Sequence, residues 1–236
     1  PSMGKSSLVL NIAEHAGTKE KKPTLIFSME MSAQQVAQNM LCSKAKIDAH
    51  LLRTGKLDDS QFSNLSLAMG DLSESEIFID DTPGLGLLEL RAKARRLKLQ
   101  HNIQMIIVDY LQLMEGRKEE NRQQEISSIS RGLKALAREL EVPVIAVSQL
   151  NRSVETREGH TPRMSDLRES GSIEQDADVI ILLHREDYYD PTKRPGEVDL
   201  NIAKQRNGPT GKVKLTFLRE ILRFENYQHN TSSDEN

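Results

Sequence analysis

The sequence of 236 residues is poor in several features that define other classes of protein. It has one cysteine, Cys42, which excludes a disulfide framework and a cysteine-rich zinc site and favours a reducing, intracellular setting. Its six histidines are scattered without the spacing of metal ligands. No apolar run approaches the roughly 18 residues of a membrane span, and residues 1–7 are polar, unlike a secretory signal peptide. We therefore expect a cytoplasmic domain without a membrane segment.

The sequence also has no excess of positive charge. Its 32 Lys and Arg residues are outnumbered by 35 Asp and Glu residues, which leaves a formal net charge of -3. This balance excludes a protein that binds nucleic acid through bulk positive charge, although it leaves room for a local basic stripe. Hydrophobic residues make up 37% of the chain, which supports a packed core, and the length suits one large domain better than two.

Short apolar runs alternate with segments of helical periodicity, a pattern typical of a parallel sheet covered by helices. Strands are predicted at residues 24–28, 77–80, 104–109, 143–148, 179–184, 198–204 and 212–218. Helices are predicted at residues 8–16, 32–45, 58–69, 87–99 and 126–140. We expect the last two strands to be antiparallel additions at the edge of the sheet. The whole pattern predicts an α/β domain over residues 1–228, followed by a polar tail over residues 229–236.

Residues 1–7, PSMGKSS, match the second half of a phosphate-binding P-loop, G-x-x-x-x-G-K-[ST]. Backbone N–H groups of such a turn and of the helix that follows hold phosphate oxygens. Lys5 would reach the β- and γ-phosphates, and the Ser6 hydroxyl would bind Mg²⁺. The expected nucleotide-binding residues are Met3, Gly4, Lys5, Ser6 and Ser7. The alternative is a chance match to the second half of the motif, since the first glycine position falls before Pro1.

A helix that starts at a phosphate loop needs a strand that leads into it, and no strand precedes Gly4 in this sequence. We therefore expect a strand upstream of Pro1 and interpret the chain as part of a longer protein.

Two acidic residues follow predicted strands. Asp109 ends the apolar run MIIVD and matches the Walker B pattern, in which the acid holds Mg²⁺ through water at the carboxyl end of a buried strand. Glu30 follows the strand at residues 24–28, where a carboxylate can orient or deprotonate the water that attacks the γ-phosphate. The alternatives are a turn-forming Asp and a Glu that the helix dipole favours near a helix start.

Three further polar residues end later strands. The Gln149 amide, after residues 143–148, can hydrogen-bond the γ-phosphate or its water, or it is an ordinary polar residue at a strand end. Lys204 and Arg206 lie beside the turn at Gly208. They either prevent edge-to-edge pairing of the sheet, or act as an arginine finger on a nucleotide held by the adjacent subunit. Spacing alone does not separate these two interpretations.

The polar segment 150–172 contains no aromatic side chain, which argues against base stacking with nucleic acid. Near its end, Arg168, Glu169 and Gly171 lie in a run that offers a cation, hydroxyls and backbone N–H groups. Such groups suit contacts to DNA phosphates, which are indifferent to base sequence. A solvated active-site loop is the alternative interpretation.

Six segments, taken together, closely resemble the C-terminal RecA-like motor domain of the bacterial replicative DNA helicases, the DnaB family. They are PSMGKS, FSMEMS, IIVDYLQLM, VSQLNR, DLRESGSIEQDAD and KQRNG, and they occur in this order over nearly the whole chain. The resemblance implies a RecA-like P-loop NTPase fold, with a mainly parallel sheet flanked by helices. It also implies a homo-hexameric ring that hydrolyses ATP with Mg²⁺ at subunit interfaces. The ring would move 5′ to 3′ along single-stranded DNA, with primase and a helicase loader as partners.

The resemblance also implies roles for individual residues. Gly4, Lys5 and Ser6 would bind phosphate and Mg²⁺, Asp109 would be the Walker B acid, Glu30 the catalytic carboxylate and Gln149 the γ-phosphate sensor. Lys204 and Arg206 would reach in trans to the neighbour's nucleotide. Arg168, Glu169 and Gly171 would belong to a central-channel loop that follows DNA phosphates.

Two other classes of function stay open. One is a recombinase-type or clock-type RecA-fold ATPase, which would build a filament or act on proteins. The other is a non-catalytic docking module for primase or a helicase loader. The run over residues 166–178, together with residues 204–206, favours the helicase.

Overall fold

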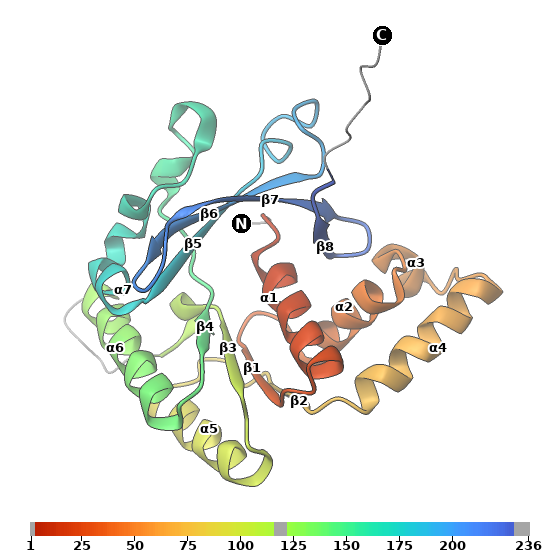
Figure 1. Ribbon diagram of the computed structural model, residues 1–236, viewed down its shortest axis with the longest axis horizontal. Coiled ribbons are helices and arrows are strands. Elements are labelled where there is room, and N and C mark those ends of the chain that lie inside the picture. The colour runs from red at the N-terminus through yellow and green to blue at the C-terminus, as the bar shows by residue number, and fades with distance from the viewer. Residues whose placement is uncertain (1–2, 116–121, 229–236) are drawn as a thin grey trace.

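The computed structural model describes residues 3–115 and 122–228. Within these ranges the strands form two four-stranded sheets, one parallel and one antiparallel (Figure 1). The parallel sheet has the order β2-β1-β3-β4, and its strands are β1 (Thr24–Ser28), β2 (Ile77–Asp80), β3 (Met105–Asp109) and β4 (Val144–Ala146). Every residue of β1 and β3 is buried, because these two strands lie in the middle of the sheet between layers of helices.

The helices connect these strands and cover the sheet. They are α1 (Lys5–Glu14), α2 (Ala33–Ala45), α3 (Ala49–Thr54), α4 (Asp59–Ser73), α5 (Leu87–His101), α6 (Arg122–Leu140) and α7 (Gly171–Asp176). A π-helical turn, His15–Lys19, continues α1, and short 3-10 turns lie at Leu111–Leu113, Arg152–Val154, Glu158–His160 and Met164–Ser170. Among the residues described, no helix is both long and apolar enough to cross a membrane.

Alternate residues of the central strands point to opposite faces of the sheet, and each face has its own helices. Ile26 and Ile107 pack with α1 and α2, whereas Leu25 and Ile106 pack with α5 and α6. Figure 1 shows the two pairs of helices on opposite sides of the parallel sheet. The predicted α/β architecture is confirmed.

The antiparallel strands are β5 (Val179–His184), β6 (Glu197–Gln205), β7 (Gly211–Leu218) and β8 (Arg223–Asn226), paired in that order. The antiparallel strands predicted near the C-terminal end are thus confirmed. Their predicted place at the edge of the parallel sheet is wrong. Within the described ranges they pair with β5 and β8 in a separate sheet, in which short turns join β6 to β7 and β7 to β8. The short elements α3, α7 and β8, which have 4 to 6 residues, were not predicted from the sequence.

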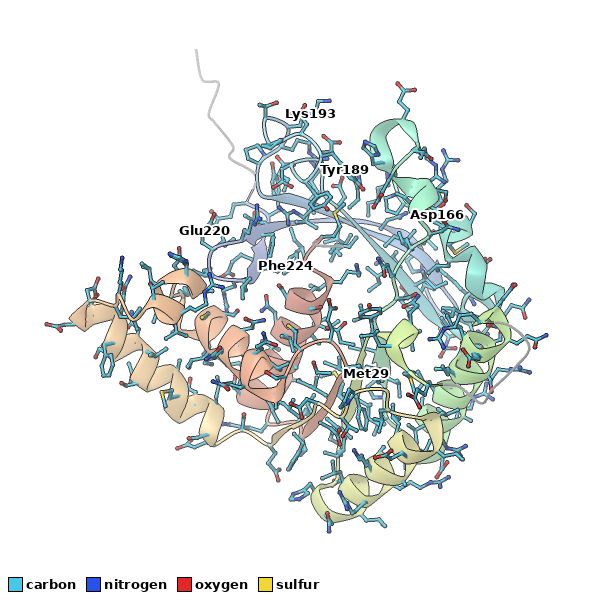
Figure 2. The ribbon with its side chains drawn as sticks, turned by 180° about the vertical axis from the view of Figure 1, so that it is seen from behind. Met29, Asp166, Tyr189, Lys193, Glu220 and Phe224 are labelled. Atoms are coloured by element: carbon cyan, nitrogen blue, oxygen red, sulfur yellow. The ribbon has the colours of Figure 1, made fainter. Side chains whose placement is uncertain are left out.

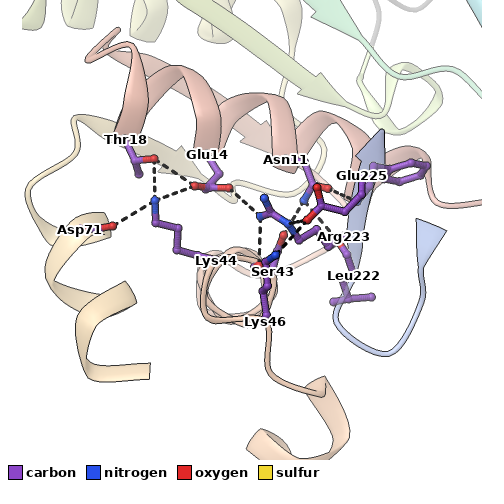
Figure 3. A network of polar contacts seen from close by, with 11 residues as sticks. Asn11, Glu14, Thr18, Ser43, Lys44, Lys46, Asp71, Leu222, Arg223 and Glu225 are labelled. Carbon is purple, nitrogen blue, oxygen red and sulfur yellow. Dashed lines mark hydrogen bonds and ion pairs between the residues drawn. The ribbon is translucent and has the colours of Figure 1, made fainter. Parts of the chain in front are cut away.

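A network of charged and polar side chains fastens the end of α1 to α2 and β8 (Figure 3). The buried Glu14 carboxylate accepts a hydrogen bond from Thr18 at 3.1 Å and pairs with Lys44 at 3.2 Å and Arg223 at 3.6 Å. The Asn11 side chain accepts a backbone hydrogen bond from β8 at 2.8 Å. The helix that begins at the candidate phosphate loop is therefore held firmly against both of these elements.

An ion pair organises the polar segment 150–172. Arg157 donates to both oxygens of Asp166, at 2.9 and 2.7 Å, and the backbone N–H of Arg163 donates to the same carboxylate at 2.7 Å. The Arg157 guanidinium lowers the pKa of the Asp166 carboxyl below its usual value. Asp166, labelled in Figure 2, is thus the anchor of this segment ahead of α7.

Candidate functional site

The residue before α1 has a conformation and surroundings that suit glycine, as expected for the predicted phosphate loop. Gly4 is the N-cap of α1 and has φ 91° and ψ 16°, a left-handed conformation that favours glycine. A Cβ atom at Gly4 would also lie 3.0 Å from the ring of Phe224 and 3.5 Å from that of Phe217. Figure 2 shows Phe224 close to α1. Both the backbone and the packing therefore require glycine, and the free N–H groups of the first helical turn are left for an anion.

Lys5, Ser6 and Asp109 meet at the carboxyl edge of the parallel sheet. The Ser6 hydroxyl lies close to the Asp109 carboxylate and lowers the pKa of that carboxyl, and Lys5 interacts electrostatically with Asp109 and Glu30. Asp109 pairs in register with Ser28, so the ends of β3 and β1 coincide. The topology thus brings together residues that lie about a hundred positions apart in the sequence.

The site is desolvated, and its charges affect one another. Burial raises the pKa of the Asp109 carboxyl, an effect that Glu30 adds to, whereas the Ser6 hydroxyl and the Lys5 charge oppose it. Burial lowers the pKa of the Lys5 ammonium, and the charges of Asp109 and Glu30 oppose that change. Asp109 is only 3% exposed, so its charge is costly unless another cation lies nearby.

The residues fit a magnesium ion. The Oδ1 atom of Asp109 is buried and has no hydrogen-bond partner, while the Ser6 hydroxyl lies against the same carboxylate. In the described part of the chain there is no group of three or more His, Cys, Asp or Glu side chains that could hold a metal. One carboxylate and one hydroxyl suit Mg²⁺, which keeps several waters and is otherwise held by substrate phosphates.

Glu30 lies in a tight turn between β1 and α2. The Ser28 hydroxyl donates to the carbonyl of Met31 at 2.7 Å, which closes the turn around Met29 and Glu30 (Met29 is labelled in Figure 2). Ser32 then caps α2, as predicted, in a reciprocal capping box with Gln35. Glu30 is therefore exposed on a turn that is fixed at both ends, and its charge is felt at Asp109 and Lys5.

Gln149 lies beside the same edge of the sheet. The backbone N–H of Val147 donates to Val108 at 2.9 Å, and that of Leu111 donates to Val147 at 3.0 Å, so the segment after β4 runs along the end of β3. Gln149 follows two residues later and is exposed. The structure thus places four of the predicted residues at one edge of the sheet: Asp109 ends β3, Glu30 and Gln149 follow β1 and β4, and Lys5 begins α1.

Lys204 and Arg206 lie elsewhere, at the end of β6 beside α7 (Figure 1). Lys204 Nζ donates to the carbonyl oxygens of Glu174 at 2.5 Å and Gln175 at 3.4 Å. Arg206 donates to the same Gln175 oxygen at 3.4 Å, and its Nε atom is 3.6 Å from Asp178. Both cations therefore contact the carboxyl end of α7, where a helix favours positive charge.

The predicted DNA-binding residues precede or begin this same short helix. Gly171 is exposed and is the first residue of α7. The side chains of Arg168 and Glu169 lie outside what the structure describes, as do Pro1 and Ser2 at the start of the phosphate loop. The predicted channel residues therefore lie at or just before the start of α7, and Lys204 and Arg206 contact its end.

Comparison with known proteins decides the family. The model of the DnaB-like helicase C terminal domain matches residues 1–226. The chain belongs to this family. It is 54% identical to the "Replicative DNA helicase DnaB" of Geobacillus stearothermophilus over 231 residues, which are 97% of this chain and 51% of that protein. It is 53% identical to the "Replicative DNA helicase DnaC" of Bacillus subtilis (strain 168), again over 231 residues, with the same coverage of both proteins. The chain therefore spans about half the length of these curated relatives.

Solved structures of the DnaB-like family have the same fold. One is described as an "ATPase Domain", with a TM-score of 0.92 and 38% identity over 97% of this chain and 82% of that one. A second, "The Structure Of A DnaB-Like Replicative Helicase And Its Interactions With Primase", has the same TM-score and identity over 97% of this chain and 56% of its own. The predicted family and the predicted RecA-like fold class are both confirmed.

The sequence did not single out two features of this DnaB-like domain. One is the aromatic pair Phe217 and Phe224, stacked with ring centroids 4.5 Å apart, against which Gly4 packs. The other is Gln112, which contacts the segment that holds Gln149. Gln112 lies inside the family-like run IIVDYLQLM, but no spacing rule marks a lone amide among apolar residues as functional.

Proposed function

We propose that this chain is the ATP-driven motor domain of a replicative DNA helicase. It would hydrolyse ATP at the interfaces of a homo-hexameric ring and move 5′ to 3′ along single-stranded DNA to unwind the duplex at the fork. One observation carries the proposal: the phosphate loop, Asp109 and Glu30 converge at one edge of the sheet, while Lys204 and Arg206 are presented at another place. That division is what an active site shared between two subunits needs.

In the nucleotide-holding half, the loop amides and Lys5 would bind the β- and γ-phosphates of ATP. Ser6 and Asp109 would hold Mg²⁺, which when bound neutralises charge that develops on these phosphates. Glu30 would orient or deprotonate the attacking water, because it lies at the mouth of the site on a turn fixed by Ser28 and Ser32. Gln149 would contact the γ-phosphate or its water.

In the other half, Arg206 and Lys204 would complete the neighbour's site. A trans arginine finger contributes about 10³- to 10⁵-fold to the rate in related phosphoryl-transfer systems. Hydrolysis would therefore depend on assembly. The end of β6 that carries Lys204 contacts α7, and Gly171 begins α7. A contact of Arg168, Glu169 and Gly171 with DNA phosphates would therefore affect the cations that reach the neighbouring subunit's nucleotide.

The partners follow from the relatives rather than from the site. One structural relative is described with its interactions with primase, and we extend primase to this chain as a partner. A helicase loader and a cytoplasmic location are proposed by the resemblance to the family. A docking role for these partners is compatible with the motor and does not replace it, since a pure docking surface has no need of a buried carboxylate with an unpaired oxygen.

Mixing two inactive variants tests the shared site. Glu30→Gln should remove the activity of its own site, and Arg206→Ala should remove the activity of the neighbour's site, each lowering DNA-stimulated ATP hydrolysis by about 10³-fold or more. In an equimolar mixture, about one interface in four combines an intact Glu30 with an intact Arg206 in random assembly. The mixture should then regain about a quarter of the wild-type rate, measured at concentrations that span assembly.

Three results would contradict the proposal. A fully active Arg206→Ala variant would exclude the trans cation, and an active Glu30→Gln variant would exclude the catalytic carboxylate. If the wild-type chain hydrolysed no ATP at any concentration with single-stranded DNA, a docking module would be the better interpretation.

A further inference from the structure

Gln112 lies where the pairing between β3 and β4 ends. The parallel ladder between these strands ends at Val108 and Ala146. Two backbone hydrogen bonds, from Val147 N–H to Val108 at 2.9 Å and from Leu111 N–H to Val147 at 3.0 Å, continue the contact just beyond it. A 3-10 turn, Leu111–Leu113, follows β3 and turns the Gln112 side chain back toward the segment after β4. Two residues after Val147, at Gln149, a side chain makes the contact between the two segments.

The Gln112 amide brackets the backbone of Gln149. Its Oε1 atom accepts a hydrogen bond from the Gln149 N–H at 3.2 Å. Its Nε2 atom donates to the Gln149 carbonyl at 3.1 Å and to the Ser148 hydroxyl at 2.9 Å. Both main-chain polar groups of one residue are thus held by one planar amide, as a neighbouring strand would hold them.

This contact requires a primary amide of this length. An amide supplies a donor and an acceptor from the same group, whereas a carboxylate only accepts and a thioether or an alkyl chain has no strong donor. Asparagine is shorter by one methylene. Gln112 is the residue type that meets both demands.

The other side of Gln112 is also fixed. Its carbonyl accepts a hydrogen bond from Arg122 Nη2 at 2.6 Å, and the same guanidinium donates to the Met114 carbonyl at 3.2 Å and pairs with Glu125 at 2.5 Å. Arg122 is the first residue of α6, so Gln112 is held between a helix and the segment that bears Gln149.

We propose that Gln112 is a positioning residue that sets the direction of the Gln149 side chain relative to Asp109. It touches no reacting atom and acts only through the Gln149 backbone. The inference rests on the proposed function, because it takes Gln149 as the group that contacts the γ-phosphate. The two hydrogen bonds between Gln112 and Gln149 lie near the surface, where a hydrogen bond contributes little net free energy to folding. If the role of Gln112 were purely structural, a variant that lacks these two bonds should therefore keep nearly full activity.

The test compares DNA-stimulated ATP hydrolysis by Gln112→Met and Gln112→Glu with that of the wild-type chain. Each should lower kcat about tenfold, the effect of one misaligned transition-state hydrogen bond, and leave KM for ATP within about twofold. Melting temperatures should be unchanged. Gln104→Glu is a matched control, because Gln104 is another half-buried glutamine and its amide donates to a local carbonyl, that of Asn102 at 3.0 Å. It should match the wild type in all three measurements.

Combination with Gln149→Ala separates the outcomes. If Gln112 acts through Gln149, Gln112→Met should add nothing to the loss caused by Gln149→Ala. Multiplying losses, or unchanged kcat in both Gln112 variants while Gln149→Ala is impaired, would overturn the positioning role. A joint fall of kcat and melting temperature would overturn it in favour of a structural role. An unimpaired Gln149→Ala variant would instead show that the proposed function of Gln149 is wrong, and the inference would fall with it.

Discussion

The proposed nucleotide site around Asp109 and the cationic end of β6 hold their charged groups in opposite ways. Asp109 is 3% exposed at the end of a strand whose five residues are all buried, and its neighbours Lys5 and Ser6 come from the first turn of a fixed helix. The Arg206 side chain is 49% exposed, and its contacts with Gln175 and Asp178 are long, at 3.4 and 3.6 Å. One region is fixed by its own fold, and the other is free to change partners.

This difference in burial and in contact distance affects how readily Asp109 and Arg206 can gain new partners. A buried, partly unpaired carboxylate is unfavourable by itself, and binding of a cation and phosphates beside it would relieve that cost. An exposed ion pair contributes roughly 0 to 1 kcal/mol, so Arg206 can leave Asp178 for a neighbour's phosphate at little cost. The chain therefore has a preorganised site around Asp109 and an exposed cation, Arg206, that can change partners. This is consistent with ATP hydrolysis that requires a second subunit.

Lys5→Ala should give the largest effect of the changes that test this comparison, because it removes the cation proposed to bind the phosphates. We expect kcat/KM for ATP to fall by at least about 10²- to 10³-fold, the range for loss of one oriented charge-stabilising group. The fold should persist, since burial already makes the Lys5 charge unfavourable. Lys19→Ala is the matched control, because Lys19 is exposed in the π-helical turn that continues α1. A Lys5→Ala variant that retained activity would show that the preorganised site is not the nucleotide site.

Asp109→Asn should separate stability from activity. The pKa of Asp109 is raised by burial, so the folded protein holds this proton more tightly than the unfolded chain does. Stability of the nucleotide-free protein then falls as pH rises from the usual Asp value of 3.8 through the raised pKa. At pH 7 the carboxylate is at its most costly, and Asn should stabilise the fold by about 1 kcal/mol while Mg²⁺-dependent hydrolysis is lost.

Urea unfolding of wild type and Asp109→Asn at several pH values, without magnesium or nucleotide, checks this expectation. The advantage of the Asn variant should be greatest near pH 7 and should disappear below pH 3.8, the usual Asp value. A destabilised Asn variant would mean that residues of the chain itself already satisfy the Asp109 charge, and the contrast with Arg206 would be lost.

Sequence alone was enough to predict where the buried site lies, because each of its residues ends a strand or a turn with a strong local signal. Asp109 closes an apolar run, and Gly4 and Lys5 belong to a spaced motif. The contacts of Lys204 with α7 and of Gln112 with Gln149 were not predictable. They join residues 30 and 37 positions apart through a six-residue helix and a single amide, which leave no periodic trace in the sequence. The roles of all these residues stay predictions until variants are measured.

Asp178→Asn should give the smallest effect and complete the comparison. The Lys134 ammonium, which is hydrogen-bonded to Asp178, lowers the pKa of this carboxyl, and Arg206 adds to the effect. The sign is therefore the reverse of that for Asp109: its contribution to stability is present above the usual value of 3.8 and is lost as pH falls through the lowered pKa. Because Asp178 is half exposed, we expect a loss of about 0.5 kcal/mol or less at pH 7 by urea unfolding, and a kcat within about twofold of wild type. A large fall in kcat with unchanged KM would show that Asp178 directs Arg206 toward the neighbour. The end of β6 would then be fixed by its own fold, as the surroundings of Asp109 are, because the direction of Arg206 would depend on Asp178 of the same chain.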